Sequence, residues 1–195
     1  MDNKSYQDYF FKEAKKSGYR SRSAFKLIEL NKKFKFLKNN INILDVGSYP
    51  GSWCQVIKEK TKNVKILGID KKITEEIQGI KFIKGDFLRK ESKVSIQKYF
   101  NSNIDVILSD MASNTTGNKS LDCIRTNLLC IEILDFSKEI LNKKGVVISK
   151  FFMGEEFQEI KVRAKKYFKK IDFFKPDSSR NESRETYIHC KDLST

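Results

Sequence analysis

The sequence is poor in several residue types, and each scarcity argues against a class of protein. Its 195 residues include a single histidine, His189, whereas a zinc site needs several ligands, so we expect no metal centre. The four cysteines form no C-x-x-C pair, and we expect them to be reduced and packed in the interior. No apolar run approaches the ~18 residues of a membrane span, and residues 1–40 lack the pattern of a secretory signal. We therefore expect no membrane partner.

Acidic residues are few relative to basic ones, and the formal net charge of +14 has two interpretations. A lysine-rich surface can simply be solvated, or it can attract a polyanion such as nucleic acid. Arginine is the scarce cation, with seven residues against 32 lysines. Four of the seven lie in two short stretches near the ends of the chain, at Arg20, Arg22, Arg180 and Arg184. A planar guanidinium suits bidentate phosphate binding, and a buried salt bridge is the alternative.

Hydrophobic periodicity predicts an alternation of helices and strands. We expect helices over 6–18, 21–34, 52–61, 121–145 and 154–168, and strands over 41–47, 64–70, 80–86, 104–110, 146–152, 169–176 and 185–191. Three of the strands are apolar nearly throughout, as central parallel strands covered on both faces are. The last two strands are joined by about nine residues, too few for a parallel crossover, so the last should run antiparallel. The pattern predicts a doubly wound α/β fold with helices on both faces of the sheet.

Three predicted strands end in aspartate, at Asp70, Asp86 and Asp110. Ligands of open α/β sheets bind outside the carboxyl ends of the strands, so these side chains should converge on one crevice. The alternative for any single one is that it caps the turn that follows its strand. Because three acids occur at corresponding strand ends, a shared ligand site is the favoured interpretation.

The loop DVGSYPGSW follows the first strand and opens a helix. Gly47 permits a tight turn, Gly51 allows a ligand to come close to the backbone, and Trp53 lies in the first turn of the helix. Asp70 follows Gly51 by 19 residues, at the end of the next strand, where an acid binds the ribose hydroxyls of an adenosine cofactor. Two glycines and a bulky tryptophan fit a pyrophosphate poorly. The loop therefore favours S-adenosylmethionine as cofactor over a nicotinamide dinucleotide.

One lysine stands in an unusual place, within the strand sequence GVVISKFF at 145–152. The other seven residues suit a buried strand, so Lys150 places a cation where the chain should be driest. A buried lysine with a lowered pKa can act as a general base. The alternative is that Lys150 lies just past the dry part of the strand and extends its ammonium group to water.

Seven segments occur in the order found in the FtsJ family of ribose 2′-O-methyltransferases: RSRSAFKL, LDVGSYPGSWCQ, GIDK, KGDF, LSDMASN, SKFF and KPDSSRNESRETYI. The chain resembles this family from about residue 4 to residue 191. The resemblance implies a Rossmann-like, S-adenosylmethionine-dependent methyltransferase fold with a mostly parallel seven-stranded sheet and an antiparallel last strand. It implies cofactor contacts at five matching positions, which are Gly51, Trp53, Asp70, Asp86 and Asp110.

The resemblance also implies a catalytic set of two lysines and two acids, Lys26, Asp110, Lys150 and Glu185. A ribose 2′-hydroxyl is a poor nucleophile, and it must lose its proton during attack on the methyl group. We expect Lys150 to accept or orient this proton. Asp110 and Glu185 would hold the lysines in register, and Lys26 would stabilise developing charge and help to position the RNA.

Two motifs depart from the usual family pattern. The first loop usually reads G-A-A-P-G-G-W, whereas this chain has Ser48, Tyr49 and Ser52. Tyr49 is bulkier than the usual residue, and we expect it to alter the lip of the cofactor pocket. The acidic motif usually reads D-M-A-P-N, and here Ser113 replaces the proline, which removes a rigid residue from the loop after Asp110.

Short members of the family modify a uridine of large-subunit ribosomal RNA, and the resemblance implies this RNA or the large ribosomal subunit as substrate. Related members modify the anticodon loop of tRNA. A third interpretation is a non-catalytic ribosome-assembly factor on the same fold. The expected phosphate-binding rim consists of Lys12, Lys15, Lys16, Arg20, Arg22, Arg180 and Arg184. For the three lysines the alternative is an ordinary basic surface.

The pattern along the chain predicts one domain over 1–195. We expect residues 1–38 to form a helical segment that carries RNA contacts and Lys26, and residues 39–195 to form the Rossmann-like core. We expect a monomer in the cytoplasm, or in a mitochondrion or plastid if the chain is an organellar member of the family.

Overall fold

The computed structural model describes residues 3–180 and 182–194, with side chains from Tyr9 onward. The predicted domain ends, residues 1 and 195, lie outside the described residues. The helices are α1 (Asn3–Lys16), α2 (Ser23–Phe34), α3 (Ser52–Lys60), α4 (Lys90–Phe100), α5 (Lys119–Ile140) and α6 (Phe157–Tyr167). The strands are β1 (Asn42–Val46), β2 (Lys65–Asp70), β3 (Lys81–Lys84), β4 (Ile104–Ser109), β5 (Leu141–Phe152), β6 (Phe168–Phe174) and β7 (Glu185–Leu193).

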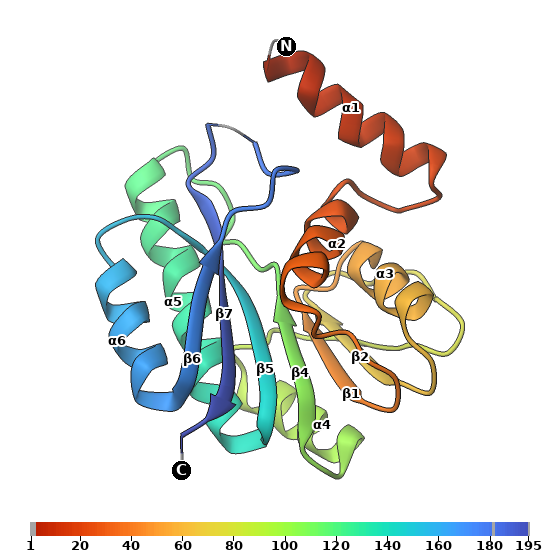
Figure 1. The fold of residues 1–195 in the computed structure, drawn as a ribbon, viewed down its shortest axis with the longest axis vertical. Coiled ribbons are helices and arrows are strands. Elements are labelled where there is room, and N and C mark those ends of the chain that lie inside the picture. The colour runs from red at the N-terminus through yellow and green to blue at the C-terminus, as the bar shows by residue number, and fades with distance from the viewer. Residues whose placement is uncertain (1–2, 181, 195) are drawn as a thin grey trace.

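The strands form one seven-stranded sheet in the order β3-β2-β1-β4-β5-β7-β6 (Figure 1). The pairs from β3 to β5 are parallel, and β7 runs antiparallel to both β5 and β6. The predicted antiparallel last strand is therefore confirmed, because the short 175–184 connection brings the chain straight back. The strand order reverses between β1 and β4, which is where ligands bind in sheets of this kind.

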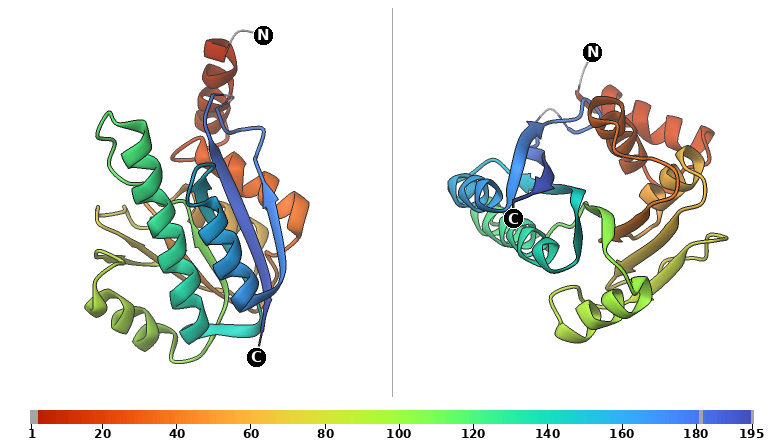
Figure 2. Two further views of the ribbon diagram at one scale, coloured as in Figure 1. Left: turned by 90° about the vertical axis from the view of Figure 1, so that its left-hand side faces the viewer. Right: turned by 60° about the horizontal axis from the view of Figure 1, so that its bottom comes forward.

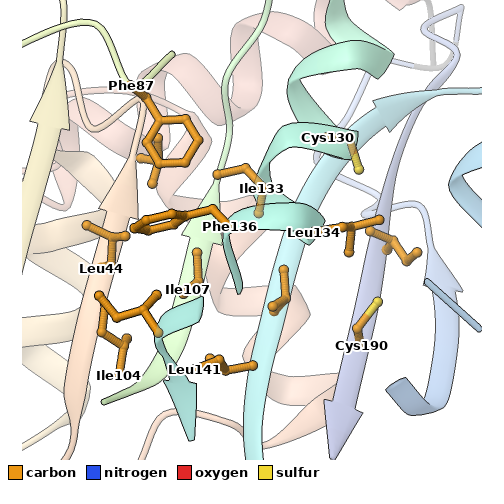
Figure 3. Packing of buried hydrophobic residues seen from close by; sticks show 14 of the residues in the cluster. Leu44, Phe87, Ile104, Ile107, Cys130, Ile133, Leu134, Phe136, Leu141 and Cys190 are labelled. Carbon is orange, nitrogen blue, oxygen red and sulfur yellow. The ribbon is translucent and has the colours of Figure 1, made fainter. Parts of the chain in front are cut away.

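Helices cover both faces of the sheet, as predicted (Figures 1 and 2). On one face, α2 and α3 pack over a cluster that includes Leu27, Trp53 and Ile148. On the other face, α4, α5 and α6 pack over a second cluster, in which Phe136 lies close to Leu44 (Figure 3). Each large apolar side chain contributes roughly 1.5–3 kcal/mol on burial. All four cysteines are free and buried, as the sequence predicts.

Two parts of the predicted secondary structure are wrong. No helix was expected between 87 and 103, yet α4 lies there and buries Ser92, Ile96 and Phe100 on one face. Val94 of this helix is apolar but exposed, so it obscures the helical spacing of the buried residues in the sequence. The long helix ends at Ile140 rather than near Gly145, because Leu141 leaves the helix and pairs with Ile104 at the start of β5.

Gly145 therefore has a different role from the expected helix stop. A Cβ on this residue would lie 2.5 Å from Leu141 Cγ, so glycine is what lets the start of β5 fold closely on itself. The switch from helical to strand spacing occurs within four residues here, too short a stretch for hydrophobic periodicity to locate the boundary.

Both edge strands of the sheet carry lysines. β3 has Lys81 and Lys84, and β6 has Lys169 and Lys170, all exposed. Charges on an edge strand oppose pairing with another chain. Within the described part of the chain, none of the helices is both long and apolar enough to cross a membrane.

Candidate active site

Lys150 lies near the end of β5, and its side chain is only 7% exposed. Its Nζ donates to the backbone oxygen of Asp110 at 2.6 Å and to Asp110 Oδ1 at 2.9 Å. Tyr187 stands opposite Lys150 on β7 and donates its hydroxyl to the same Oδ1 at 2.7 Å. Lys150 thus has internal partners, and the alternative in which its ammonium group extends to water does not hold.

A second ion pair lies near the first. Lys26 Nζ of α2 is 2.7 Å from Oε1 and 2.9 Å from Oε2 of Glu185, the first residue of β7. Ser179 donates its hydroxyl to Glu185 Oε1 at 2.8 Å. The four residues of the predicted catalytic set therefore come together in two pairs, although they come from α2, β5, β7 and the residue that follows β4.

The charges of this cluster fix the ionisation of Asp110 and Lys26. Burial alone would raise the pKa of Asp110, but the positive charges of Lys150 and Lys26 and the Tyr187 hydrogen bond outweigh it and lower that pKa to about 2. Burial alone would lower the pKa of Lys26, but the negative charges of Asp110 and Glu185 outweigh it and raise that pKa. Both side chains are therefore charged at neutral pH.

A cleft of about 310 Å³ opens onto the two ion pairs. It is lined by Ser21, Arg22, Ser23, Lys26, Ala112, Lys150, Phe152, Arg180, Ser183 and Glu185. One wall comes from the start of α2 and the other from the 175–184 connection, with Lys150 from the sheet between them. A second hollow, of about 560 Å³, lies between α5 and α6 and contains none of the predicted site residues.

The end of β5 is held in place by a buried amide. Asn127 of α5 accepts a hydrogen bond from the Phe152 N–H at 2.8 Å and donates to the Phe152 oxygen at 3.0 Å. It also donates to Glu156 Oε2 at 3.0 Å. One side chain thereby ties α5 to the strand end that carries Lys150 and to the start of α6.

Replacing Asn127 with alanine is expected to lower the free energy of unfolding by about 3 kcal/mol, because buried backbone groups lose their partners. The corresponding fall in Tm is roughly 6–12 °C for a chain of this size. Thermal unfolding of Asn127→Ala checks this, with the exposed loop residue Asn114→Ala as the control. A shift no larger than that of the control would contradict the assignment.

The loop after β1 adopts the turn that its glycines permit, with φ of +79° at Gly47 and +105° at Gly51. A Cβ on Gly51 would lie 2.9 Å from a guanidinium nitrogen of Arg20. Arg20 donates to the backbone oxygens of Pro50 at 3.0 Å, Glu75 at 2.9 Å and Glu76 at 3.1 Å. Gly51 thus makes room for Arg20, whose donors join the loop after β1 to the segment after β2.

Asp70 ends β2, as predicted, whereas Asp86 lies two residues beyond the end of β3, and both acids also cap their own turns. Asp70 accepts from the backbone N–H of Tyr49 at 3.1 Å and of Lys72 at 2.8 Å. Asp86 accepts from the Leu88 N–H at 3.1 Å and pairs with Lys71 at 3.0 Å. Burial opposes ionisation of Asp86, but these two partners outweigh it and lower its pKa. Asp70 is therefore the acid that touches the first loop directly.

Trp53 lies almost wholly inside the fold. Its indole N–H donates to the backbone oxygen of Ser23 at 2.8 Å, and its ring is 6.0 Å from that of Tyr187. The tryptophan thereby links α3 to the start of α2 and to the strand opposite Lys150.

Sequence reasoning missed one buried acid in the first motif. Asp45 of β1 is 1% exposed, accepts a hydrogen bond from the Cys54 thiol at 3.2 Å, and has no partner for Oδ1 among the described residues. Burial raises its pKa to about 7, partly offset by the Cys54 hydrogen bond. The available signal was an acid within an otherwise apolar strand, the same signal that singled out Lys150.

Ser113 is tied to α5 by bonds that a proline lacks. Its N–H donates to Thr126 Oγ1 at 3.2 Å, and its hydroxyl donates to the Asp122 oxygen at 3.2 Å. Thr116 adds two bonds from its N–H to the Asp122 carboxylate, at 2.9 and 3.1 Å. Hydrogen bonds thus restrain the loop that follows Asp110, in place of the fixed proline dihedral of the usual motif.

Five of the seven residues predicted to bind phosphate are exposed, and they lie in two places. Lys12, Lys15 and Lys16 are exposed on α1, which projects from the body at the end where the strands of the parallel pairs finish (Figure 1). Arg180 and Arg184 are exposed on the 175–184 connection. Exposed aromatic residues accompany the lysines on α1, with Tyr9 57% and Phe11 51% exposed and Lys15 Nζ 4.8 Å from the centre of the Phe11 ring.

Comparison with known proteins gives consistent matches over most of the chain. The sequence model of the FtsJ-like methyltransferase family matches residues 19–193. A ribosomal RNA large subunit methyltransferase E of Pelagibacter ubique is 48% identical over 98% of this chain and 94% of its own length. The protein of the same name from Wolbachia pipientis is 42% identical over 93% of both chains. The crystal structure of a candidate ribosomal RNA methyltransferase of Plasmodium falciparum superposes with a TM-score of 0.79 at 38% identity, covering 90% of this chain and 98% of the other.

Proposed function

Because the chain belongs to the FtsJ-like methyltransferase family, we propose that it transfers a methyl group from S-adenosylmethionine to the 2′-oxygen of a uridine ribose in large-subunit ribosomal RNA. The observation that carries this proposal is the pair of nearly buried ion pairs at one cleft, Lys150 with Asp110 and Lys26 with Glu185. Burying charges is costly, so such a cluster is more typical of catalysis than of RNA binding alone. Relatives named for the large-subunit RNA support this substrate.

The residues around the ends of β1 and β2 fit the expected cofactor. The buried Oδ1 of Asp45 has no partner among the described residues, and Asp70 presents a partly exposed carboxylate beside the loop after β1. In the proposal Gly47, Gly51, Trp53, Asp70, Asp86 and Asp110 frame S-adenosylmethionine. Asp70 binds the ribose hydroxyls of its adenosine part. Gly51 and Trp53 hold the loop and helix that form its pocket. When bound, the cofactor supplies an electrophilic methyl group.

The chain's own residues then orient the acceptor ribose and move its proton. In the proposal Lys150 Nζ, which lies at the cleft, accepts or orients the proton of the 2′-hydroxyl. The backbone oxygen and Oδ1 of Asp110 fix the direction of Nζ, with Tyr187 holding Oδ1 from the other side. Lys26, held by Glu185, stabilises the negative charge that develops on the 2′-oxygen. Both lysine side chains are mostly buried at the cleft, with Lys26 13% and Lys150 7% exposed.

Basic residues near the cleft and on α1 form the proposed RNA surface, which consists of Lys12, Lys15, Lys16, Arg22, Arg180 and Arg184. Arg22 and Arg180 line the cleft itself. Arg20 is better assigned to a supporting role, because its donors bind three backbone oxygens. On α1 the lysines suit phosphates, while the rings of Tyr9 and Phe11 suit unpaired bases.

Reversing two charges on α1 tests this surface. The Lys15→Glu/Lys16→Glu variant is expected to weaken RNA binding and to reduce the slope of log K against log salt by roughly 2, about 1 for each phosphate that is no longer neutralised. Titration of fluorescent RNA at several salt concentrations measures both quantities. Lys143→Glu/Lys144→Glu, at the opposite end of the molecule, is the matched control. Equal slopes for the two variants would remove α1 from the RNA surface.

Two other functions predict different labelling patterns. A tRNA anticodon-loop methyltransferase would use the same cleft on another RNA, and an assembly factor would bind the cofactor and ribosomal RNA without methyl transfer. Incubation with tritiated S-adenosylmethionine and tRNA, naked large-subunit RNA or intact large subunits separates the three. Label in the large subunit or its RNA supports the proposal, label only in tRNA replaces the substrate, and cofactor binding without label in any RNA favours the assembly factor.

The remaining parts of the proposal concern the whole protein. We propose that the protein is a monomer, in keeping with the lysines on both edge strands. We also propose that it acts in the cytoplasm, because the similar proteins named above come from bacteria. An organelle is the alternative location. The chain acts as one domain, in which the helical segment 1–38 joins the Rossmann-like core 39–195 through α2.

A further inference from the structure

One face of α2 is occupied by three residues that all contact the 177–185 segment. Arg22, Lys26 and Glu29 are spaced by four and three residues, which places them on one side of the helix. The Arg22 guanidinium donates to the Ser178 oxygen at 2.7 Å, and Lys26 pairs with Glu185 at 2.7 Å. The two walls of the cleft are thus joined along a single helix face.

Glu29 makes the third contact and uses both carboxylate oxygens. Oε2 accepts from the backbone N–H of Asp177 at 2.6 Å, and Oε1 accepts from that of Ser178 at 3.0 Å. Ser178 is therefore held from both sides, by Glu29 at its N–H and by Arg22 at its carbonyl oxygen. The next residue, Ser179, is 2% exposed and donates to Glu185. A continuous set of bonds leads from Glu29 to the acid that holds Lys26.

We propose that Glu29 is a positioning residue for methyl transfer, which acts by fixing the backbone of Asp177 and Ser178 and so the Ser179–Glu185–Lys26 alignment. The inference rests on the proposed function, since the cleft is taken as the acceptor site. The 175–184 connection has no regular structure of its own among its described residues, yet its Arg180 and Ser183 line the cleft. A segment of this kind keeps its position only where specific bonds anchor it.

The Glu29→Gln variant keeps the shape of the side chain but turns one acceptor into a donor that faces a backbone N–H. Its kcat is expected to fall about tenfold, because the loss of a charge-assisted bond shifts the catalytic groups. The Kd for S-adenosylmethionine should stay within about twofold, since none of the bonds described involves the cofactor residues. Glu139→Gln, an exposed helical glutamate at the far end of α5, is the matched control and should match the wild type in both quantities.

A double-mutant comparison separates positioning from a general effect on folding. In a Glu185→Ala background, Glu29→Gln should lower kcat by less than about twofold, because its effect passes through Glu185. Ser179→Ala should lower kcat in the same way while leaving the Glu29 contacts intact. An unchanged kcat for Glu29→Gln, or an equal fall in both backgrounds, would overturn the proposal.

Hydrogen exchange supplies a readout that does not depend on activity. The amides of Asp177 and Ser178 should exchange about tenfold faster in Glu29→Gln than in the wild type, whereas Ser179→Ala should leave them unchanged. Unchanged exchange in Glu29→Gln would overturn the role of Glu29. Absence of methyl transfer by the wild type, with the expected exchange pattern, would instead overturn the proposed function.

Discussion

Replacing Lys150 with methionine is expected to lower kcat for methyl transfer by about 10³-fold, the middle of the range for loss of a general base. Methionine fills most of the buried space but carries no amine to accept the 2′-hydroxyl proton. The Kd for S-adenosylmethionine should change little, because Asp110 keeps its Tyr187 partner and the charge of nearby Lys26. The effect should therefore appear in the single-turnover rate at saturating RNA and cofactor.

A matched control lies on the same strand. Lys144 is exposed near the start of β5, and Lys144→Met should leave kcat unchanged. Circular dichroism and cofactor binding of Lys150→Met exclude loss of the fold as the cause. Methyl transfer at more than about a tenth of the wild-type rate by a folded Lys150→Met variant would contradict the assigned role, since a general base contributes at least about 10²-fold.

Replacing Asp45 with asparagine is expected to remove a loss of about 4 kcal/mol in the free energy of unfolding that the wild type shows between about pH 4 and pH 7. Burial raises the pKa of Asp45 to about 7, from an ordinary 3.8. An acid whose folded pKa is raised stabilises the folded state fully below its unfolded pKa, and that contribution is lost as the pH rises through the folded value. The wild type should therefore lose about 4 kcal/mol from this residue between roughly pH 4 and pH 7.

Asparagine does not ionise, so the Asp45→Asn variant lacks this loss. Other acids such as Asp110 titrate in both proteins and cancel in the comparison. The free energy of unfolding of Asp45→Asn minus that of the wild type should therefore rise with pH, whatever constant cost the new amide adds. Urea unfolding at pH 4, 5.5, 7 and 8 measures this difference, and a constant difference across the range would contradict the buried, poorly partnered state of Asp45.

The sequence was most informative where a residue conflicted with its surroundings. Apolar runs located the central strands, and the short last connection predicted the antiparallel β7. Lys150 stood out because a cation interrupted such a run, and its Asp110 partner lies at the end of the adjacent strand β4. The boundary between α5 and β5 was misplaced because the pairing of Leu141 with Ile104 of β4 is tertiary and leaves no periodic trace in the sequence.

The arginines show the limit of residue-type arguments. Their scarcity suggested a need for the planar guanidinium, either for phosphate binding or for a buried salt bridge. Both Arg20 and Arg22 also donate to backbone carbonyl oxygens. Arg20 binds those of Pro50, Glu75 and Glu76, and Arg22 binds that of Ser178. Backbone acceptors carry no sequence signature, so only the fold reveals them. Glu29 was not predicted as a site residue for the same reason, because its partners are two backbone N–H groups.

In the proposed function, the cleft between α2 and the 175–184 connection methylates a ribose of large-subunit RNA, with Lys150 as the proton acceptor. The most direct test gives large ribosomal subunits and tritiated S-adenosylmethionine to the wild type and to Lys150→Met, followed by nucleoside mapping of the label. We expect a single 2′-O-methylated uridine with the wild type and at most a trace of it with the variant. Label on a base, or equal label with both proteins, would contradict it.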